Sequence, residues 1–142
     1  SELVQASAEL ETARLMADWH GSVVSSPDLV RIWGAHMGEG AAALTDEDRA
    51  RLIWVIAQYF TIVEGLYKQR LRGFLSVDSW LPYERTMSGL LRKPLVSEFV
   101  TSSTGAFSGE FLDLCTRLIE SPRDDDWQFR GLETFGSAET VA

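Results

Sequence analysis

Cysteine and basic side chains are scarce in this 142-residue chain, and both shortages exclude classes of protein. The single cysteine, Cys115, cannot form an internal disulfide, and its position within FLDLCTRLI predicts a buried side chain rather than a reactive thiol. Only 13 lysine and arginine residues stand against 21 acidic residues, which gives a net charge of −8. Because a phosphate backbone is bound by a basic surface, we expect no nucleic-acid partner.

The motifs of common catalytic and metal sites are missing as well. The sequence has no Gly-x-Ser-x-Gly elbow for a serine nucleophile, and MGEGAA lacks the lysine and serine of a phosphate-binding loop. A di-metal site in a helical bundle uses Glu-x-x-His pairs, and none occurs; the nearest pair, His36 and Glu39, runs in the reverse order. We therefore expect no metal, no cofactor and no catalytic residue, and we favour a protein that is not an enzyme.

Long hydrophobic runs are also lacking. The longest, residues 52–63, contains Gln58 and is shorter than the roughly 20 residues that a membrane-spanning helix needs. Apolar residues still make up 45% of the chain, which is too many for a disordered protein. The length suits one domain with one core, and we expect a cytoplasmic protein.

Helical periodicity is the main positive signal. Apolar residues recur at intervals of three and four, and no segment of useful length alternates as a strand does. The sequence predicts an all-α fold, a single-domain helical bundle over residues 1–120 built around one long central helix. Helices are predicted for residues 3–19, 27–37, 45–74, 78–91, 94–100 and 109–120.

Short polar residues mark the predicted helix starts. The capping residues are Ser26, Thr45, Ser108 and either Ser76 or Asp78. Prolines also indicate helix starts, because a first turn does not need the N–H that proline lacks. Pro94 is predicted to begin a helix, and Pro82 is tolerated only if it lies in or near a first turn. The first helix is amphipathic, and its apolar positions are Leu3, Ala6, Leu10, Ala13 and Ala17.

The central helix, residues 45–74, has an unusually broad apolar face. Trp54, Val55 and Ile62 extend it beyond the main stripe, so more than one element must cover it. Trp54 would stay exposed in a monomer, and exposed aromatic residues of this kind are typical of interfaces. We therefore predict a homodimer or another protein partner, with Trp54 at the interface.

Residues 121–142 differ in composition from the rest of the chain. Three aspartates precede a set of spaced aromatic and apolar residues, namely Trp127, Phe129, Leu132 and Phe135. By composition this is an acidic tail, yet aromatics at such spacing can dock in a groove of the same chain or of a second copy. We predict that the tail is docked, with Trp127, Phe129 and Phe135 as interface residues.

The segment VEGLYKQRLRGFLSVDSW holds the candidate ligand site. Glu64 precedes Lys68 by four residues, the favourable order for a helical ion pair, and it is close to Tyr67 and Gln69. One interpretation is an edge residue that sets helix packing. The other is a carboxylate that binds a cation or polar ligand with Tyr67, Gln69 and His36. Because most acid–base mechanisms use a second titrating group, we favour the edge residue.

Residues 23–119 resemble a group of small bacterial proteins of unknown function, many of which carry one transmembrane helix ahead of a helical domain. The resemblance lies in PDLVRIW, in LTDEDRARL, in GAFSGEFLDL and in Glu64, Tyr67, Gln69, Gly73 and Trp80. Pro82 and the residues after Glu120 depart from the group's pattern. The resemblance implies a helical fold and a tether to the inner membrane through a segment absent from this chain. It implies no reaction and no catalytic residue.

Together these features predict a helical interaction or ligand-sensing domain without enzyme activity. The alternative is an enzyme, or a small-molecule or cofactor-binding protein, with a site between helices near Glu64 and Tyr67. A third possibility is a purely structural adaptor.

Overall fold

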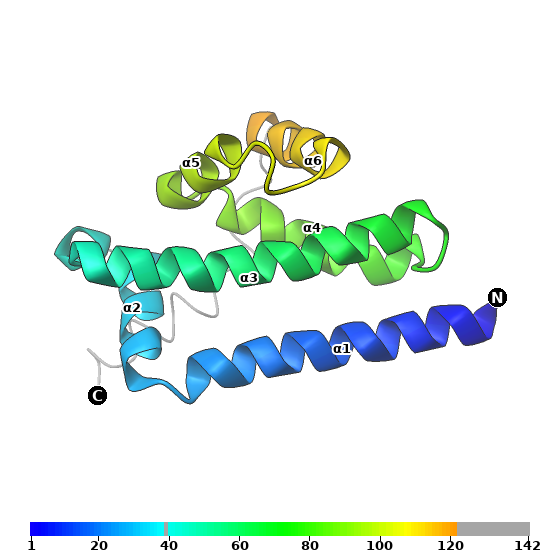
Figure 1. The fold of residues 1–142 in the computed structure, drawn as a ribbon, viewed down its shortest axis with the longest axis horizontal. Coiled ribbons are helices and arrows are strands. Elements are labelled where there is room, and N and C mark those ends of the chain that lie inside the picture. Colours follow the sequence, from blue (N-terminus) through cyan, green and yellow to red (C-terminus); the bar gives the residue numbers. More distant parts are fainter. Residues whose placement is uncertain (39, 122–142) are drawn as a thin grey trace.

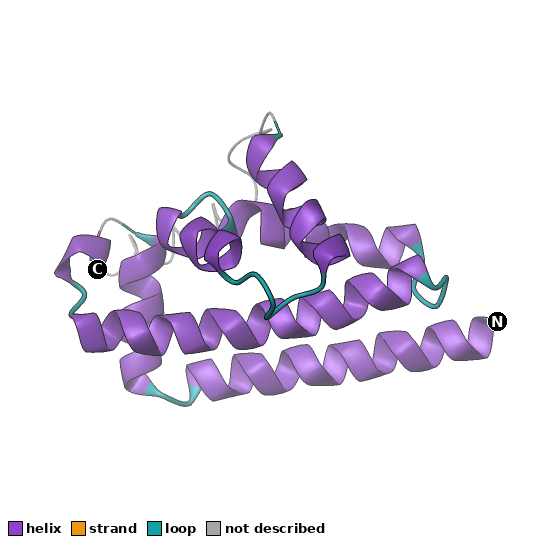
Figure 2. Ribbon diagram, turned by 45° about the horizontal axis from the view of Figure 1, so that its top comes forward, coloured by secondary structure: helices purple, strands orange, loops and turns teal. Residues whose placement is uncertain are grey.

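The computed structural model describes residues 1–38 and 40–121 (Figure 1). Within these ranges the chain forms six α-helices and one short 3-10 helix, which confirms the all-α prediction (Figure 2). The helices are α1 Glu2–Val24, α2 Pro27–Met37, α3 Asp46–Leu71, α4 Val77–Leu90, α5 Pro94–Ser102 and α6 Gly109–Glu120, with the 3-10 helix η1 at Gly40–Ala43. The interface residues predicted in the tail, Trp127, Phe129 and Phe135, lie outside the described residues.

Two long helices, rather than the one predicted, lie side by side. α1 has 23 residues and α3 has 26. In Figure 1, α1 lies along one side of α3 and α5 and α6 lie on the other, whereas α4 crosses behind α3. The Ser79 hydroxyl of α4 donates to the Glu9 carboxylate of α1 at 2.6 Å. α2 joins the two long helices at one end, and α3 contacts α1, α2, α4 and α5. α3 is therefore the central helix, and the other helices pack around it.

The helix starts follow the polar signals in the sequence. The hydroxyls of Ser26, Thr45 and Ser108 each accept a backbone N–H bond from the first turn that follows. The cap of α4 is Ser76 rather than Asp78, and its hydroxyl accepts from the Ser79 N–H at 3.1 Å. Local side-chain chemistry is thus enough to fix where these helices begin.

Pro82 lies inside α4, which corrects its expected place in or near the first turn. The helix begins at Val77, so Pro82 falls in the second turn, where its missing N–H removes one helical hydrogen bond. The helix continues past it to Leu90, and Met87 and Leu90 beyond the proline are buried. Burial of these side chains offsets the lost bond.

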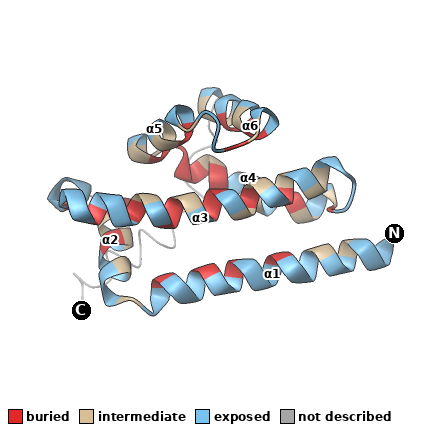
Figure 3. Ribbon diagram, viewed as in Figure 1, coloured by how far each residue is buried: buried red, intermediate tan, exposed pale blue. Residues whose placement is uncertain are grey.

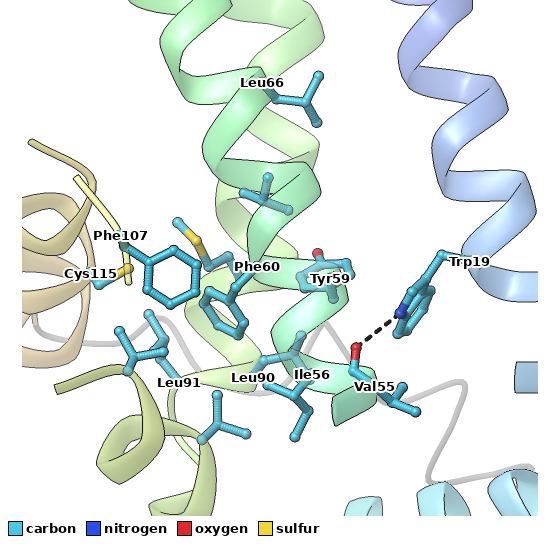
Figure 4. Close-up of a cluster of buried hydrophobic side chains, with 14 of the residues drawn as sticks. Trp19, Val55, Ile56, Tyr59, Phe60, Leu66, Leu90, Leu91, Phe107 and Cys115 are labelled. Carbon is cyan, nitrogen blue, oxygen red and sulfur yellow. Dashed lines mark hydrogen bonds between the residues drawn. The ribbon is translucent and has the colours of Figure 1, made fainter. Parts of the chain in front are cut away.

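The core lies on both sides of α3. The buried apolar residues of this helix are Leu52, Val55, Ile56, Tyr59, Phe60, Val63 and Leu66. Tyr59 lies toward Trp19 of α1, and the Trp19 indole N–H donates to the Val55 carbonyl at 3.0 Å (Figure 4). Phe60 lies on the other side, against Phe111 of α6 at a ring separation of 6.3 Å. Adjacent residues of one helix thereby join both sides of the core.

The broad apolar face of α3 is covered by the chain's own helices. Val55 is buried and Ile62 is partly buried, whereas Trp54 stays 74% exposed. The prediction that more than one element covers the face is confirmed, because α1 and α4 both contact it. An uncovered α3 face therefore no longer supports the predicted homodimer.

The buried face of α1 differs from the predicted one. The predicted positions Leu3, Ala6, Leu10, Ala13 and Ala17 are all exposed, and the buried residues are Thr12, Met16, Trp19 and Val23 (Figure 3). The sequence did not indicate this face because one of its members, Thr12, is polar. The Thr12 hydroxyl donates to the Ala8 carbonyl at 2.8 Å, so it keeps a hydrogen-bond partner when it is buried. α1 has two apolar faces, and the one with the larger side chains packs in the core.

A bidentate ion pair joins α2 to the start of α3. Arg31 donates to both carboxylate oxygens of Asp48, at 3.0 and 3.3 Å. Asp48 also accepts from the Thr45 N–H, while the Thr45 hydroxyl accepts from the Asp48 N–H, which completes a capping box. The hydrogen bond from Arg31, followed by that from Thr45, lowers the pKa of Asp48 to about 2.

The low pKa of Asp48 predicts a specific loss of stability in acid. A carboxylate with a lowered folded-state pKa stabilises the fold fully above its unfolded pKa of about 4, and this contribution is lost as the pH falls toward 2. Asp48→Asn should reduce the free energy of unfolding at pH 6, and the difference from wild type should shrink between pH 4 and pH 2. Urea unfolding at several pH values measures it. Asp46→Asn, in the same turn but exposed, is the control; an unchanging difference for Asp48→Asn would contradict the assignment.

Candidate functional site

An open groove lies where α3, α4 and α6 meet. It consists of two adjoining hollows of about 590 and 380 Å³ that share Tyr67, Leu71 and Arg117. The other lining residues are Arg70, Val77, Trp80, Leu81, Glu84, Glu110, Asp113, Leu114 and Thr116. At its base the Tyr67 and Trp80 rings lie 5.4 Å apart. The groove therefore rests on packed aromatic side chains.

The groove combines apolar and charged surface. Leu71 is 52% exposed, and Val77 on α4 is also exposed. Charged side chains of both signs stand among the lining residues: Arg70, Arg117, Glu84, Glu110 and Asp113. An open apolar surface edged by mixed charge suits a peptide segment better than a small molecule, which proteins usually enclose.

Glu64 connects α3 to the start of α6. Its side chain is only 14% exposed, and one carboxylate oxygen accepts from the Ser108 N–H at 2.7 Å. Ser108 is the cap residue of α6, and a Glu or Gln three residues later often accepts this N–H. That position holds Phe111, so Glu64 supplies the carboxylate from another helix. The expected pair with Lys68 is present as a long contact of 3.9 Å.

Tyr67 is the one predicted ligand residue that lines the groove. Its ring also lies 6.3 Å from the Phe111 ring. Gln69 is partly buried outside the lining, and its side-chain oxygen has no hydrogen-bond partner among the described residues. The structure therefore places Glu64 at the α6 cap and Tyr67 in the groove, and it does not join Gln69 to them. Leu71 and Val77, which sequence reasoning missed as site residues, form the exposed apolar part.

His36 lies in a different part of the molecule. It is buried on α2 beside Trp33, at a ring separation of 6.2 Å, and it does not line the groove. Burial, assisted by the charge of Lys93, lowers the pKa of His36 to about 4. Its Nε2 has no hydrogen-bond partner among the described residues. His36 is therefore a buried, neutral residue that the structure does not bring together with the other predicted ligand residues.

Other candidate reactive groups are inaccessible or scattered. Burial raises the pKa of the Cys115 thiol to about 12, so it stays protonated at neutral pH. No group of three or more His, Cys, Asp or Glu side chains within residues 1–38 and 40–121 could hold a metal ion. None of the helices in this described part is both long and apolar enough to span a membrane.

Comparisons with protein-family models, curated proteins and solved structures found no match. The resemblance of residues 23–119 to a bacterial group stays a prediction. Function is therefore argued from the groove and its supporting contacts.

The hydrogen bond from the Ser108 N–H to Glu64 predicts that the stability of α6 depends on the Glu64 carboxylate. Glu64→Ala leaves the partly buried Ser108 N–H without its charged acceptor, which should cost about 1–3 kcal/mol of unfolding free energy. Urea unfolding measures the loss, and hydrogen exchange should accelerate at the start of α6. Lys68→Ala is the matched control, since loss of its half-exposed pair should cost at most about 0.5 kcal/mol. Equal losses in the two variants would contradict the capping role.

The lowered pKa of His36 predicts a second pH effect, in a different range from that of Asp48. Below the unfolded pKa of about 6.5 the unfolded chain takes up a proton that the folded chain resists, so stability falls by roughly 3 kcal/mol from pH 6.5 to 4. His36→Phe cannot be protonated and should lack this contribution. Unfolding free energies at pH 7, 5.5 and 4.5 measure it. His20→Gln changes the exposed histidine and should lose as much stability in acid as wild type, because His36 is unchanged. An equal loss of stability in His36→Phe would refute the explanation.

Proposed function

We propose that the chain is a helical interaction domain whose groove between α3, α4 and α6 binds an apolar segment of a protein partner. The observation that carries this proposal is the exposure of Leu71 and Val77 within an open groove edged by both signs of charge. Phe74, in the turn between α3 and α4, is also exposed, so three apolar side chains are close in sequence at this end of the bundle. Exposed apolar residues gathered at one end of a domain often mark a binding site.

The walls of the groove are held by contacts that do not involve a partner. Glu64 fixes the start of α6 against α3, and Phe111 in the first turn of α6 is fully buried. The Tyr67 and Trp80 rings pack beneath the opening. A groove that is formed before binding loses less conformational entropy when a partner docks, which supports a recognition role.

The mixed charge of the groove sets the chemistry of the expected partner. Arg70 and Arg117 offer cations, and Glu84, Glu110 and Asp113 offer anions. An amphipathic helix with apolar anchors at intervals of three and four, flanked by both signs of charge, meets these requirements. The charges would select the register of the segment, while the apolar anchors would supply most of the affinity.

The alternative, an enzyme or small-molecule site near Glu64 and Tyr67, has less support. The Glu64 carboxylate is already bonded to Ser108, so binding a ligand there would compete with the α6 cap. Tyr67 is accessible in the groove, but it has no buried titrating partner among the lining residues. Location in the cytoplasm and a membrane tether both stay predictions.

Selection of helical peptides from a displayed library tests the groove. Peptides selected on the wild-type chain should carry apolar residues at helical spacing, and Leu71→Asp should weaken their binding at least about tenfold, because it places a charge on the apolar surface. Isothermal calorimetry measures the affinities. Trp54→Asp, at an exposed apolar position outside the groove, is the matched control and should bind as wild type does. Peptides that bind Leu71→Asp and wild type equally would remove the proposal.

A further inference from the structure

The outer face of α1 carries an apolar stripe at heptad spacing. Its members are Leu3, Ala6, Leu10, Ala13, Ala17 and Val24, all of them exposed. Leu3 is 81% exposed and Leu10 is 73% exposed. Positions 3, 10, 17 and 24 repeat every seven residues, with positions 6 and 13 three residues later, which is the a and d pattern of a coiled coil. The third d position holds the exposed, polar His20. We call the six apolar residues the α1 seam.

The α1 seam is separate from the face that α1 buries in the core. Met16, Trp19 and Val23 face the rest of the chain. At 3.6 residues per turn, the centre of the seam lies about 130° around the helix from the centre of this buried face. In Figure 3 the buried residues of α1 run along the side toward α3, and the opposite side is exposed. A second helix can therefore pack on the seam without displacing α3.

The charges beside the seam are self-complementary. Glu9 lies on one flank, at a g position, and Arg14 lies on the other, at the following e position. In a parallel two-stranded coil these positions face each other, so Glu9 of each chain meets Arg14 of the other. The two-fold symmetry forms this pair twice. In an antiparallel coil g faces g and e faces e, which would not bring Glu9 and Arg14 together.

The composition of α1 argues against a lipid surface as the occupant. The helix has four acidic residues and Arg14 as its one basic residue, whereas helices that lie on membranes are rich in lysine and arginine. Three of the six seam residues are alanine, which lets two backbones approach closely. A second copy of the same helix would cover the apolar stripe, match its seven-residue spacing and pair its flanking charges.

We infer that the chain forms a parallel homodimer through the α1 seam. This inference rests on α1 alone and is independent of the groove. It places the interface on α1 and leaves Trp54, the residue that the sequence had suggested, outside it.

Native mass spectrometry and light scattering at tens of micromolar test the dimer. Wild type should have the mass of two chains, and Leu10→Glu should have the mass of one, because it puts a charge in the middle of the seam. Leu3→Glu is a second variant, and circular dichroism verifies that both stay helical. Trp54→Glu is the matched control and should remain dimeric. A wild-type monomer, or a dimer that persists in Leu10→Glu and Leu3→Glu, would overturn the inference.

Exchanging the flanking charges tests the parallel arrangement. Glu9→Arg and Arg14→Glu should each raise the dimer dissociation constant about fivefold, whereas the double variant restores both pairs and should return to the wild-type value. Glu9 also accepts from the Ser79 hydroxyl at 2.6 Å, so Ser79→Ala is the control for that contact and should stay dimeric. A double variant as weak as the single ones would rule out the parallel pairing. Leu10→Glu should leave peptide binding unchanged, which separates this inference from the groove.

Discussion

Burial of two sides of α3 is the constraint on which the rest of the structure depends. Tyr59 and Phe60 are adjacent, yet one contacts Trp19 of α1 and the other contacts Phe111 of α6. α1 packs chiefly against this helix, whereas α6 reaches it through Phe111 and also packs against α4 and α5. The hydrogen bond from the Trp19 indole to the Val55 carbonyl orients α1 with its Trp19 face toward α3, so the α1 seam is exposed to solvent. The groove exists for a similar reason, since α4 and α6 both pack near the end of α3 and leave Leu71 uncovered.

Two carboxylates fix helix starts that apolar packing alone would leave loosely placed. Asp48 completes the cap of its own helix and pairs with Arg31 of α2. Glu64 reaches from the C-terminal third of α3 to the cap residue of α6. In both cases an N–H at a helix start, which lacks an intrahelical partner, receives a charged acceptor. Each of these two carboxylates therefore ties the start of one helix to a neighbouring helix.

The sequence was most informative where structure depends on near neighbours. The caps at Ser26, Thr45 and Ser108 involve residues three apart, and all of them could be predicted. The inner face of α1 could not, because two apolar faces compete on that helix and the deciding contact, Trp19 with Val55, joins residues 36 apart. The partner of Glu64 is 44 residues away. Phe111 at the third position of α6 shows that this helix lacks its own carboxylate for the Ser108 N–H, but not which residue supplies one.

The two proposed binding surfaces involve different helix faces. The α1 seam lies on the exposed face of α1, whereas the groove lies between α3, α4 and α6. A parallel pairing would bring both α1 helices together at corresponding heights, so the two grooves would be related by the two-fold axis. A partner with two apolar segments could then occupy both grooves, and the second binding event would be intramolecular, which raises the overall affinity without any new contact. Self-association through α1 would in this way strengthen recognition at a surface that it does not touch.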